Sequence, residues 1–394
     1  MPCVQARAKQ ERDAYIRANR RDVNEFEGVS DRVEILKIIH RPRKFDPLVN
    51  WVPYQISTDA VYLGLEKEEC ERLSAYAEGL IGTDGHDVAE DILRCLAAFT
   101  DTPLDRCLRT LLSNSSFWPS LAFRNSPPDV RDSLIGRLKE DQENRNHILL
   151  ALAWIGDAVV VSQFQKWRLD PPDWRGTLFI PPEDYSREAG WELTPDGQRR
   201  DLYFKQAVGL RKGSSNSSGV FGAIAPREDS CPWCGSVLTD LFHFDLSLFG
   251  LGSSQVPQGE IRIPTCEVCT AFGTVFGATE SNGTARWSER NARPEYLPED
   301  SESWGRLPVD PLQLGANRPP LFAADQFLPT SFSQLGGHPT WIQDASYPAC
   351  PDCGDAMMFV AQVDHEDIED CSEGVFYAFL CPTCRMTATT YQQT

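Results

Sequence analysis

Apolar residues recur with helical spacing through much of the first half of the chain. Residues 68–80 and 87–99 place apolar side chains three or four positions apart, which predicts two amphipathic helices. Thr-Pro at residues 102–103 and Ser-Pro at residues 126–127 are typical helix starts, because the hydroxyl can cap a helix and proline suits its first turn. We therefore expect short helices, joined by short turns, that bury their apolar faces on one another.

The most apolar segment, residues 148–161, is interrupted by Gly156 and Asp157. Asp157 is expected to cap a following helix that turns Phe164 inward. This junction resembles HEAT repeats, in which one helix ends in Ile-Gly-Asp and the next begins with small and apolar residues. The resemblance implies a helical solenoid over about residues 60–170. An irregular all-helical domain fits the same pattern.

The pattern changes at residues 213–219, a run of glycine, serine and asparagine that is typical of a linker or an exposed loop. Short apolar runs broken by Gly, Pro and cysteine pairs follow it and predict strands. We expect an α+β, multidomain protein. Residues 1–212 would form an all-α, HEAT-like helical solenoid, and residues 213–394 a β-rich, duplicated zinc-binding domain.

The second half contains four Cys-x-x-Cys pairs. Two cysteines on one tight turn can direct both thiolates at one ion, and a second pair completes a tetrahedral shell. The spacing predicts two structural Zn²⁺ ions, with no open position for catalysis. The pairs are Cys231 and Cys234, Cys266 and Cys269, Cys350 and Cys353, and Cys381 and Cys384. Reduced, buried cysteines are the alternative, while a redox role would need a βαβ pattern that the sequence lacks.

The two sets of cysteine pairs look like copies of one another. Ser-Cys-Pro-Trp-Cys-Gly at residues 230–235 matches Ala-Cys-Pro-Asp-Cys-Gly at residues 349–354. Asp245 and Asp364 each lie 11 positions after the second cysteine of their set. We expect two similar β modules that form a pseudo-symmetric pair. Either each module binds one ion with its own cysteines, or the modules exchange halves.

Residues 333–343, Ser-Gln-Leu-Gly-Gly-His-Pro-Thr-Trp-Ile-Gln, precede the third cysteine pair, and a strand-like run ending at Asp364 follows it. This arrangement resembles the YwqG-like family, a bacterial domain of unknown function, over about residues 318–394, with a weaker copy at residues 219–285. Some members of that family are encoded among toxin and immunity genes, so the resemblance implies protein binding. Glycines 336 and 337 favour a tight turn, which would lead into a strand at Trp341.

Charge is distributed unevenly. The formal net charge is −19, and residues 213–394 contain 8 Lys and Arg against 23 Asp and Glu, with no lysine. Such a surface would repel nucleic acid and attract a basic protein. The acidic run after the predicted strand is the candidate contact. Its members are Asp364, Glu366, Asp367, Glu369 and Asp370. Simple solvation of a surface loop is the alternative.

Residues 1–21 are dense in charged side chains, without the apolar core of a secretory signal. We therefore expect a cytoplasmic protein that does not enter membranes. The sequence has no Walker loop, no dinucleotide fingerprint and no nucleophile elbow. These observations favour a non-catalytic immunity protein or inhibitor that binds a basic toxin. A zinc-ribbon adaptor in a nucleic-acid or transcription complex, or an enzyme of another kind, is the alternative.

Overall fold

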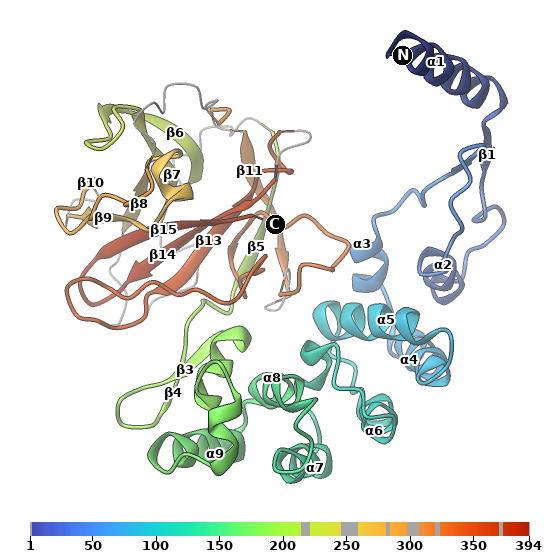
Figure 1. Cartoon of the computed structure of the whole chain (residues 1–394), viewed down its shortest axis with the longest axis horizontal. Helices are drawn as coiled ribbons and strands as arrows, with labels where there is room; N and C mark the ends of the chain where they lie inside the picture. The colour runs from blue at the N-terminus through green and yellow to red at the C-terminus, as the bar shows by residue number, and fades with distance from the viewer. Residues whose placement is uncertain are drawn as a thin grey trace. The chain divides into compact units, whose positions relative to one another are not determined.

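The computed structural model describes residues 2–213, 221–245, 259–280, 284–297, 307–309, 311–319, 324–369 and 373–393. The chain divides into two compact units, residues 1–116 and 117–394. Helices and antiparallel sheets occur together, which confirms the expected mixture of α and β structure (Figure 1). Among the described residues, no helix is both long and apolar enough to cross a lipid bilayer.

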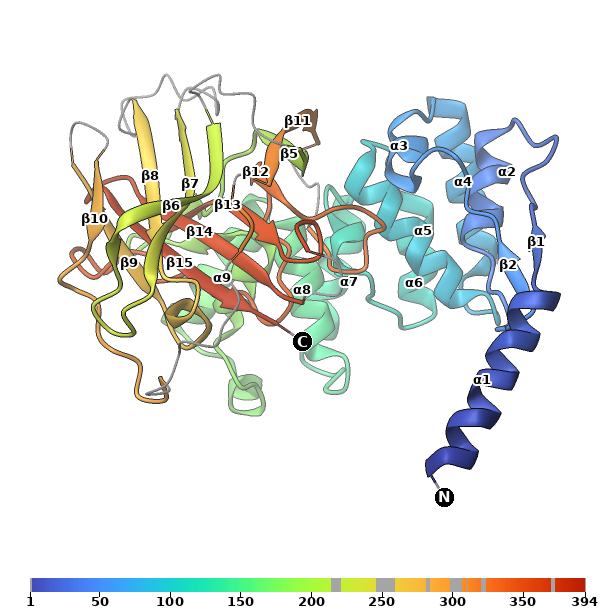
Figure 2. The same cartoon turned by 90° about the horizontal axis from the view of Figure 1, so that it is seen from above.

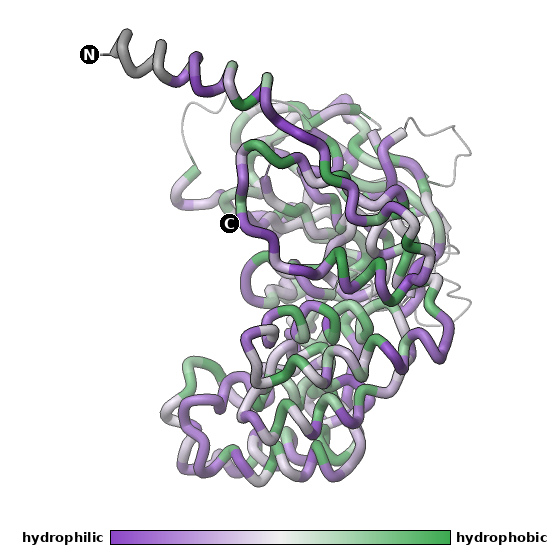
Figure 3. The backbone as a smooth tube through the Cα atoms, turned by 90° about the vertical axis from the view of Figure 1, so that its right-hand side faces the viewer, coloured by the Kyte–Doolittle hydropathy of each residue, from purple (hydrophilic) through white to green (hydrophobic). Residues whose placement is uncertain are grey.

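The first unit is mainly helical, with one short pair of parallel strands, β1 and β2. Its elements are α1 (Pro2–Asn19), β1 (Arg21–Val23), α2 (Arg32–Ile39), β2 (Val49–Trp51), α3 (Thr58–Leu63), α4 (Lys67–Leu80), α5 (His86–Phe99) and α6 (Asp105–Ser113). The coloured part of α1 is largely purple in Figure 3, because hydrophilic residues dominate it. Most residues of α5 are buried, and α3 and α4 pack against it.

The two amphipathic helices expected at residues 68–80 and 87–99 are confirmed by α4 and α5. The Thr-Pro pair at residues 102–103 does not start a helix, since α6 begins at Asp105 after Leu104. Proline restricts the residue before it to extended conformations, so this pair shapes the approach to α6 instead. The HEAT-like solenoid stays a prediction.

The second unit begins with helical elements. They are η1 (Ser120–Phe123), α7 (Pro128–Arg137), α8 (Arg145–Ile155), α9 (Ala158–Leu169), η2 (Asp173–Thr177) and η3 (Pro182–Ala189). Gly156 ends α8 with φ of 50°, and the Asp157 carboxylate caps α9 by accepting from the backbone N–H of Val159 and Val160. The cap predicted at Asp157 is therefore confirmed. Helix α7 starts one residue later than expected, because the Ser126 hydroxyl donates to the Phe123 carbonyl.

The described residues of the second unit also form three sheets. An eight-stranded antiparallel sheet has the order β10-β9-β15-β14-β13-β12-β5-β11, a three-stranded sheet has the order β6-β7-β8, and β3 pairs with β4 (Figures 1 and 2). The strands are β3 (Trp191–Leu193), β4 (Arg199–Asp201), β5 (Ala207–Lys212), β6 (Phe221–Ser230), β7 (Val237–Asp245), β8 (Glu260–Thr265), β9 (Val275–Thr279), β10 (Ala285–Trp287), β11 (Leu312–Arg318), β12 (Gln334–Gly336), β13 (Met358–Asp364), β14 (Val375–Cys381) and β15 (Met386–Gln392).

Strand β14 is buried on both faces. Phe376, Ala378 and Leu380 join a core cluster that also contains residues of β7 and β8. Tyr377 and Phe379 point to the other face and join an aromatic cluster with residues after β12. Because side chains alternate along a strand, this single strand connects the two halves of the core.

The expected boundary between residues 212 and 213 does not coincide with the division into units. Strand β5 lies before that boundary, yet it pairs with both β11 and β12. The backbone N–H of Phe359 also donates to the Leu202 carbonyl at 2.7 Å. Residues just before the glycine and serine run therefore belong to the β-rich unit.

The strand expected at Trp341 is not formed. Trp341 lies in a loop after β12 and is buried against Tyr347 and Tyr377. The next backbone N–H, that of Ile342, donates to the Tyr377 hydroxyl at 3.2 Å and to the Gln392 side-chain oxygen at 3.1 Å. Side chains of β14 and β15 thus supply the partners that a neighbouring strand would have supplied.

Candidate metal centres

The first cysteine group consists of Cys231, Cys234, Cys266 and Cys269, whose sulfur atoms all lie within 4.8 Å of one another. The Sγ atoms of Cys231 and Cys269 are 3.6 Å apart, and those of Cys234 and Cys266 are 3.5 Å apart. Four thiolates around one zinc at its usual bond length would stand about 3.8 Å apart. The observed spacing is close to that of a filled tetrahedral shell.

Two backbone turns aim these four sulfurs. In the first turn, the Gly235 N–H donates to the Cys231 carbonyl at 2.9 Å, and Gly235 has φ of 77°. In the second, the Cys269 N–H points at the Cys266 sulfur, 3.5 Å away. Glycine adopts positive φ without the strain that a Cβ would cause, so the sequence Cys-x-x-Cys-Gly favours the first turn.

The second group consists of Cys350, Cys353, Cys381 and Cys384, again with all four sulfurs within 4.8 Å of one another. The Sγ atoms of Cys353 and Cys381 are 3.7 Å apart. The same two turns recur: the Gly354 N–H donates to the Cys350 carbonyl at 2.8 Å, and the Cys384 N–H points at the Cys381 sulfur at 3.4 Å. Each group uses the two pairs that follow one another in the chain, so the copies do not exchange halves.

The hairpin between the turns is also repeated. In the first copy, β7 pairs with β8 from Thr239 opposite Thr265 to Asp245 opposite Glu260. In the second copy, β13 pairs with β14 in the equivalent register, from Met358 opposite Leu380 to Asp364 opposite Val375. The two hairpins therefore place their cysteines in the same relation to the strands. The copies diverge afterwards, because β15 pairs with β14 whereas β9 pairs with β15 and β10.

Thiols this close affect each other's ionisation. Hydrogen bonds with Cys266 and Cys269 lower the pKa of Cys231 to about 2. The hydrogen bond with Cys231 in turn raises the pKa of Cys266 to about 12. Neighbouring thiolates repel one another, so not all four thiols can be ionised without a cation. A bound metal ion would displace the remaining thiol protons. Both groups can hold a metal ion, which agrees with two structural metals.

The surroundings of the two groups differ. The first lies in an apolar cluster with Leu238, Val275 and Leu297, and three of its four cysteines are buried. In the second group only Cys350 and Cys381 are buried, and Cys353 is exposed. Access of solvent and chelators to the second group should therefore be greater.

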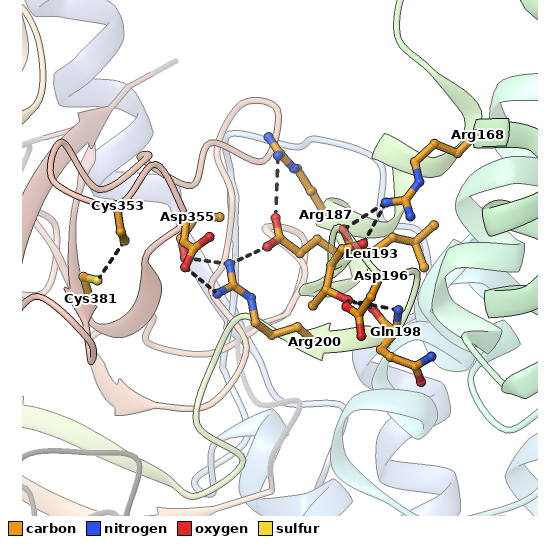
Figure 4. A network of polar contacts seen from close by, with 12 residues as sticks. Arg168, Arg187, Leu193, Asp196, Gln198, Arg200, Cys353, Asp355 and Cys381 are labelled. Carbon is orange, nitrogen blue, oxygen red and sulfur yellow. Dashed lines mark hydrogen bonds and ion pairs between the residues drawn. The ribbon is translucent and has the colours of Figure 1, made fainter.

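A polar network that includes residues of β3 and β4 lies beside the second group (Figure 4). Asp355, just after the first cysteine turn, lies 3.9 Å from the Arg200 guanidinium. Arg200 also pairs with Glu192 and donates to the Ala356 carbonyl at 3.0 Å. Glu192 lies 3.6 Å from Arg187 of η3. The spacing of the cysteines alone gave no indication of this network.

The acidic run proposed to contact a partner is only partly available. Glu366 and Glu369 are exposed. The Asp367 carboxylate accepts from the Ser331 hydroxyl at 2.7 Å and from the Ser333 N–H at 3.0 Å. Asp364 is half-buried, and burial raises its pKa to about 6. Asp370, the last member of the run, lies outside the described residues.

The fold and these sites define a two-unit protein of helices and antiparallel sheets with two four-cysteine metal-binding groups in its β-rich part. The chain is 48% identical over 398 aligned residues to the uncharacterized protein YpfL of Salmonella typhimurium, an alignment that covers all of this chain and 93% of the relative. It belongs to the same family as that protein. No family model matches the chain. No solved structure matches it either.

Proposed function

We propose that this chain is a non-catalytic protein-binding protein that neutralises a basic partner, such as a bacterial toxin. The observation that carries the proposal is the charge of residues 213–394, with 23 acidic against 8 basic residues and no lysine. Opposite charge accelerates association and selects among partners. The exposed carboxylates of Glu366 and Glu369 are suited to the edge of such a contact.

Both four-cysteine groups would bind zinc in this proposal. Sulfur-only tetrahedral shells are the usual arrangement of structural zinc and leave no position for a substrate or a reactive water. The ions would fix the two hairpins and thereby stiffen the surface that the partner contacts. The resemblance of residues 318–394 to the YwqG-like family supports a role in toxin immunity, and a HEAT-like arm over residues 60–170 would supply additional contact surface.

The test is co-purification of the full, zinc-loaded chain with proteins encoded next to it, followed by co-expression with any toxic neighbour. We expect a stable complex with a basic protein, weakened at high salt, and protection of the cells. A filter-binding assay with DNA and RNA at low salt tests the alternative that the protein binds nucleic acid. Absence of both complex and protection, or tight binding of DNA or RNA instead, would contradict the proposal.

A further inference from the structure

A cleft of about 640 Å³ lies within the second unit. Most of the residues that line it are distant in sequence from both cysteine groups. Its walls come from η1, α8, η3 and the loops at residues 324–327 and 341–345. Clefts of this size accept a ligand or a large side chain of a partner. Neither the cysteine groups nor the acidic run accounts for it.

Aromatic rings form much of the wall. Trp118, Trp154, Tyr185 and Trp341 all line the cleft. Two of these rings pack against other rings. The centroid of the Trp154 ring is 4.8 Å from that of the buried His338 ring, and the centroid of the Trp341 ring is 4.8 Å from that of the Tyr377 ring. Tyr185 donates a short hydrogen bond to the Asn146 side chain. Such fixed aromatic faces attract cations through the negative charge on the face of each ring.

The charged groups of the wall are mainly acidic. Among the described residues that line the cleft are four acidic ones, Asp184, Glu188, Asp325 and Asp344, against a single basic one, Arg187. Arg187 already faces Glu192 within the network of Figure 4. The lining therefore favours a positive ligand.

Glu188 is the most informative of these carboxyls. One of its oxygens accepts from the Ala345 N–H at 2.7 Å, which ties η3 to the loop after β12. Burial raises its pKa to about 7. Burial disfavours the ionised form of such a carboxyl. A cation that also donates hydrogen bonds would stabilise this ionised form.

We propose that this cleft receives an arginine side chain of a basic partner protein, stacked on the tryptophan rings and paired with the Glu188 carboxyl. The proposal rests on the protein-binding function proposed above and names the contact. Arginine fits better than lysine because a planar guanidinium both stacks on aromatic faces and donates two parallel hydrogen bonds to a carboxylate.

The rim favours a protein over a free amine. Phe179, Ile180 and Phe327 also line the cleft and are 98%, 42% and 60% exposed. Exposed apolar side chains around a charged pocket exclude water from the contact when a protein surface covers them. A small amine would occupy the pocket and leave this rim uncovered.

The experiment uses the full, zinc-loaded chain and four peptides, acetyl-Gly-Phe-X-Phe-Gly-amide, with arginine, lysine, citrulline or leucine at X. Citrulline has the shape of arginine without its charge. Calorimetry at low salt should give at least tenfold tighter binding for arginine than for citrulline. Glu188→Gln keeps an acceptor for the Ala345 N–H and should remove that difference, whereas the matched control Glu140→Gln, at an exposed position between α7 and α8, should retain it.

Equal binding of arginine and citrulline, or unchanged discrimination in Glu188→Gln, would overturn the proposal. Spermidine tests whether the ligand is a free amine. If spermidine binds as tightly as the arginine peptide or more tightly, the ligand is not a side chain of a protein and the proposal is overturned. If a captured partner binds wild type and Glu188→Gln with equal affinity, the cleft is not its binding site, while the proposed protein-binding function is retained. If the arginine peptide binds as expected and no protein partner is captured, the proposed function fails while the pocket stands.

Discussion

Leu241 and Val360 occupy the same place in two copies of one hairpin. Each is the extra residue of a β-bulge, since the pairing skips from Asp240 to Phe242 on β7 and from Phe359 to Ala361 on β13. Both side chains are fully buried. A bulge adds local twist and redirects a strand, so its repetition explains how the two cysteine turns reach the same geometry.

Truncation of these two side chains should destabilise the β-rich unit. Leu241→Ala removes buried methyl groups and leaves a cavity, which costs about 2–5 kcal/mol of the free energy of unfolding. Val360→Ala should cost less, because fewer atoms are lost. Urea denaturation measures both, with Val159→Ala, 45% exposed on α9, as the control that should change little. Equal stability of all three variants would show that the bulge residues do not contribute to the core.

Asp240 holds two arginines of the first copy. Its carboxylate is 2.7 Å from Arg227 and 3.1 Å from Arg262, and its side chain is only 5% exposed. Asp240→Ala leaves both guanidinium groups without this partner and should cost about 2–4 kcal/mol of unfolding free energy. Glu260→Ala removes an exposed partner of Arg262 and should have little effect. A loss no greater than that of the control would refute the importance of this buried pair.

Glu188 should make stability depend on pH. Burial raises its pKa from 4.5 to about 7, so the folded chain binds the proton more strongly than the unfolded chain. The resulting stabilisation is fully present below pH 4.5 and is lost as pH rises through about 7. Glu188→Gln stays neutral, so its advantage over wild type should grow between about pH 4.5 and 7, reaching about 1–3 kcal/mol.

Chemical denaturation at several pH values checks this difference. Glu140→Gln, at an exposed position between α7 and α8, is the matched control and should follow wild type at every pH. A constant difference between Glu188→Gln and wild type across the range would mean that Glu188 does not titrate in this window.

The two metal groups should release their ions in a fixed order. Cys353 is exposed, whereas the first group lies in an apolar cluster with three buried cysteines. A chromogenic chelator should therefore remove one ion quickly, from the second group, and the other slowly. Cys353→Ser should abolish the fast phase and Cys234→Ser the slow one. A single phase, or the reverse assignment, would contradict the role given to exposure.

Local patterns were sufficient for the features that depend on neighbouring residues. The Cys-x-x-Cys pairs, the repeat that aligns Asp245 with Asp364, and the cap at Asp157 all follow from short-range geometry. Helices α4 and α5 follow from the spacing of their apolar side chains.

Features that depend on distant residues were not predictable in the same way. Trp341 has a strand-like neighbourhood, but the backbone beside it is satisfied by Tyr377 and Gln392 from strands that follow later in the chain. Strand β5 precedes the glycine- and serine-rich run and still joins the sheet through β11 and β12. The aromatic cleft combines residues from Trp118 to Ala345, so no window of sequence contains it.

We expect each four-cysteine group to bind one structural zinc ion. Elemental analysis with native mass spectrometry on gently purified protein tests it most directly. We expect two zinc ions per chain, and one in each of the double variants Cys231→Ser/Cys234→Ser and Cys350→Ser/Cys353→Ser. Fewer than one zinc per wild-type chain, or full zinc content in both double variants, would contradict it.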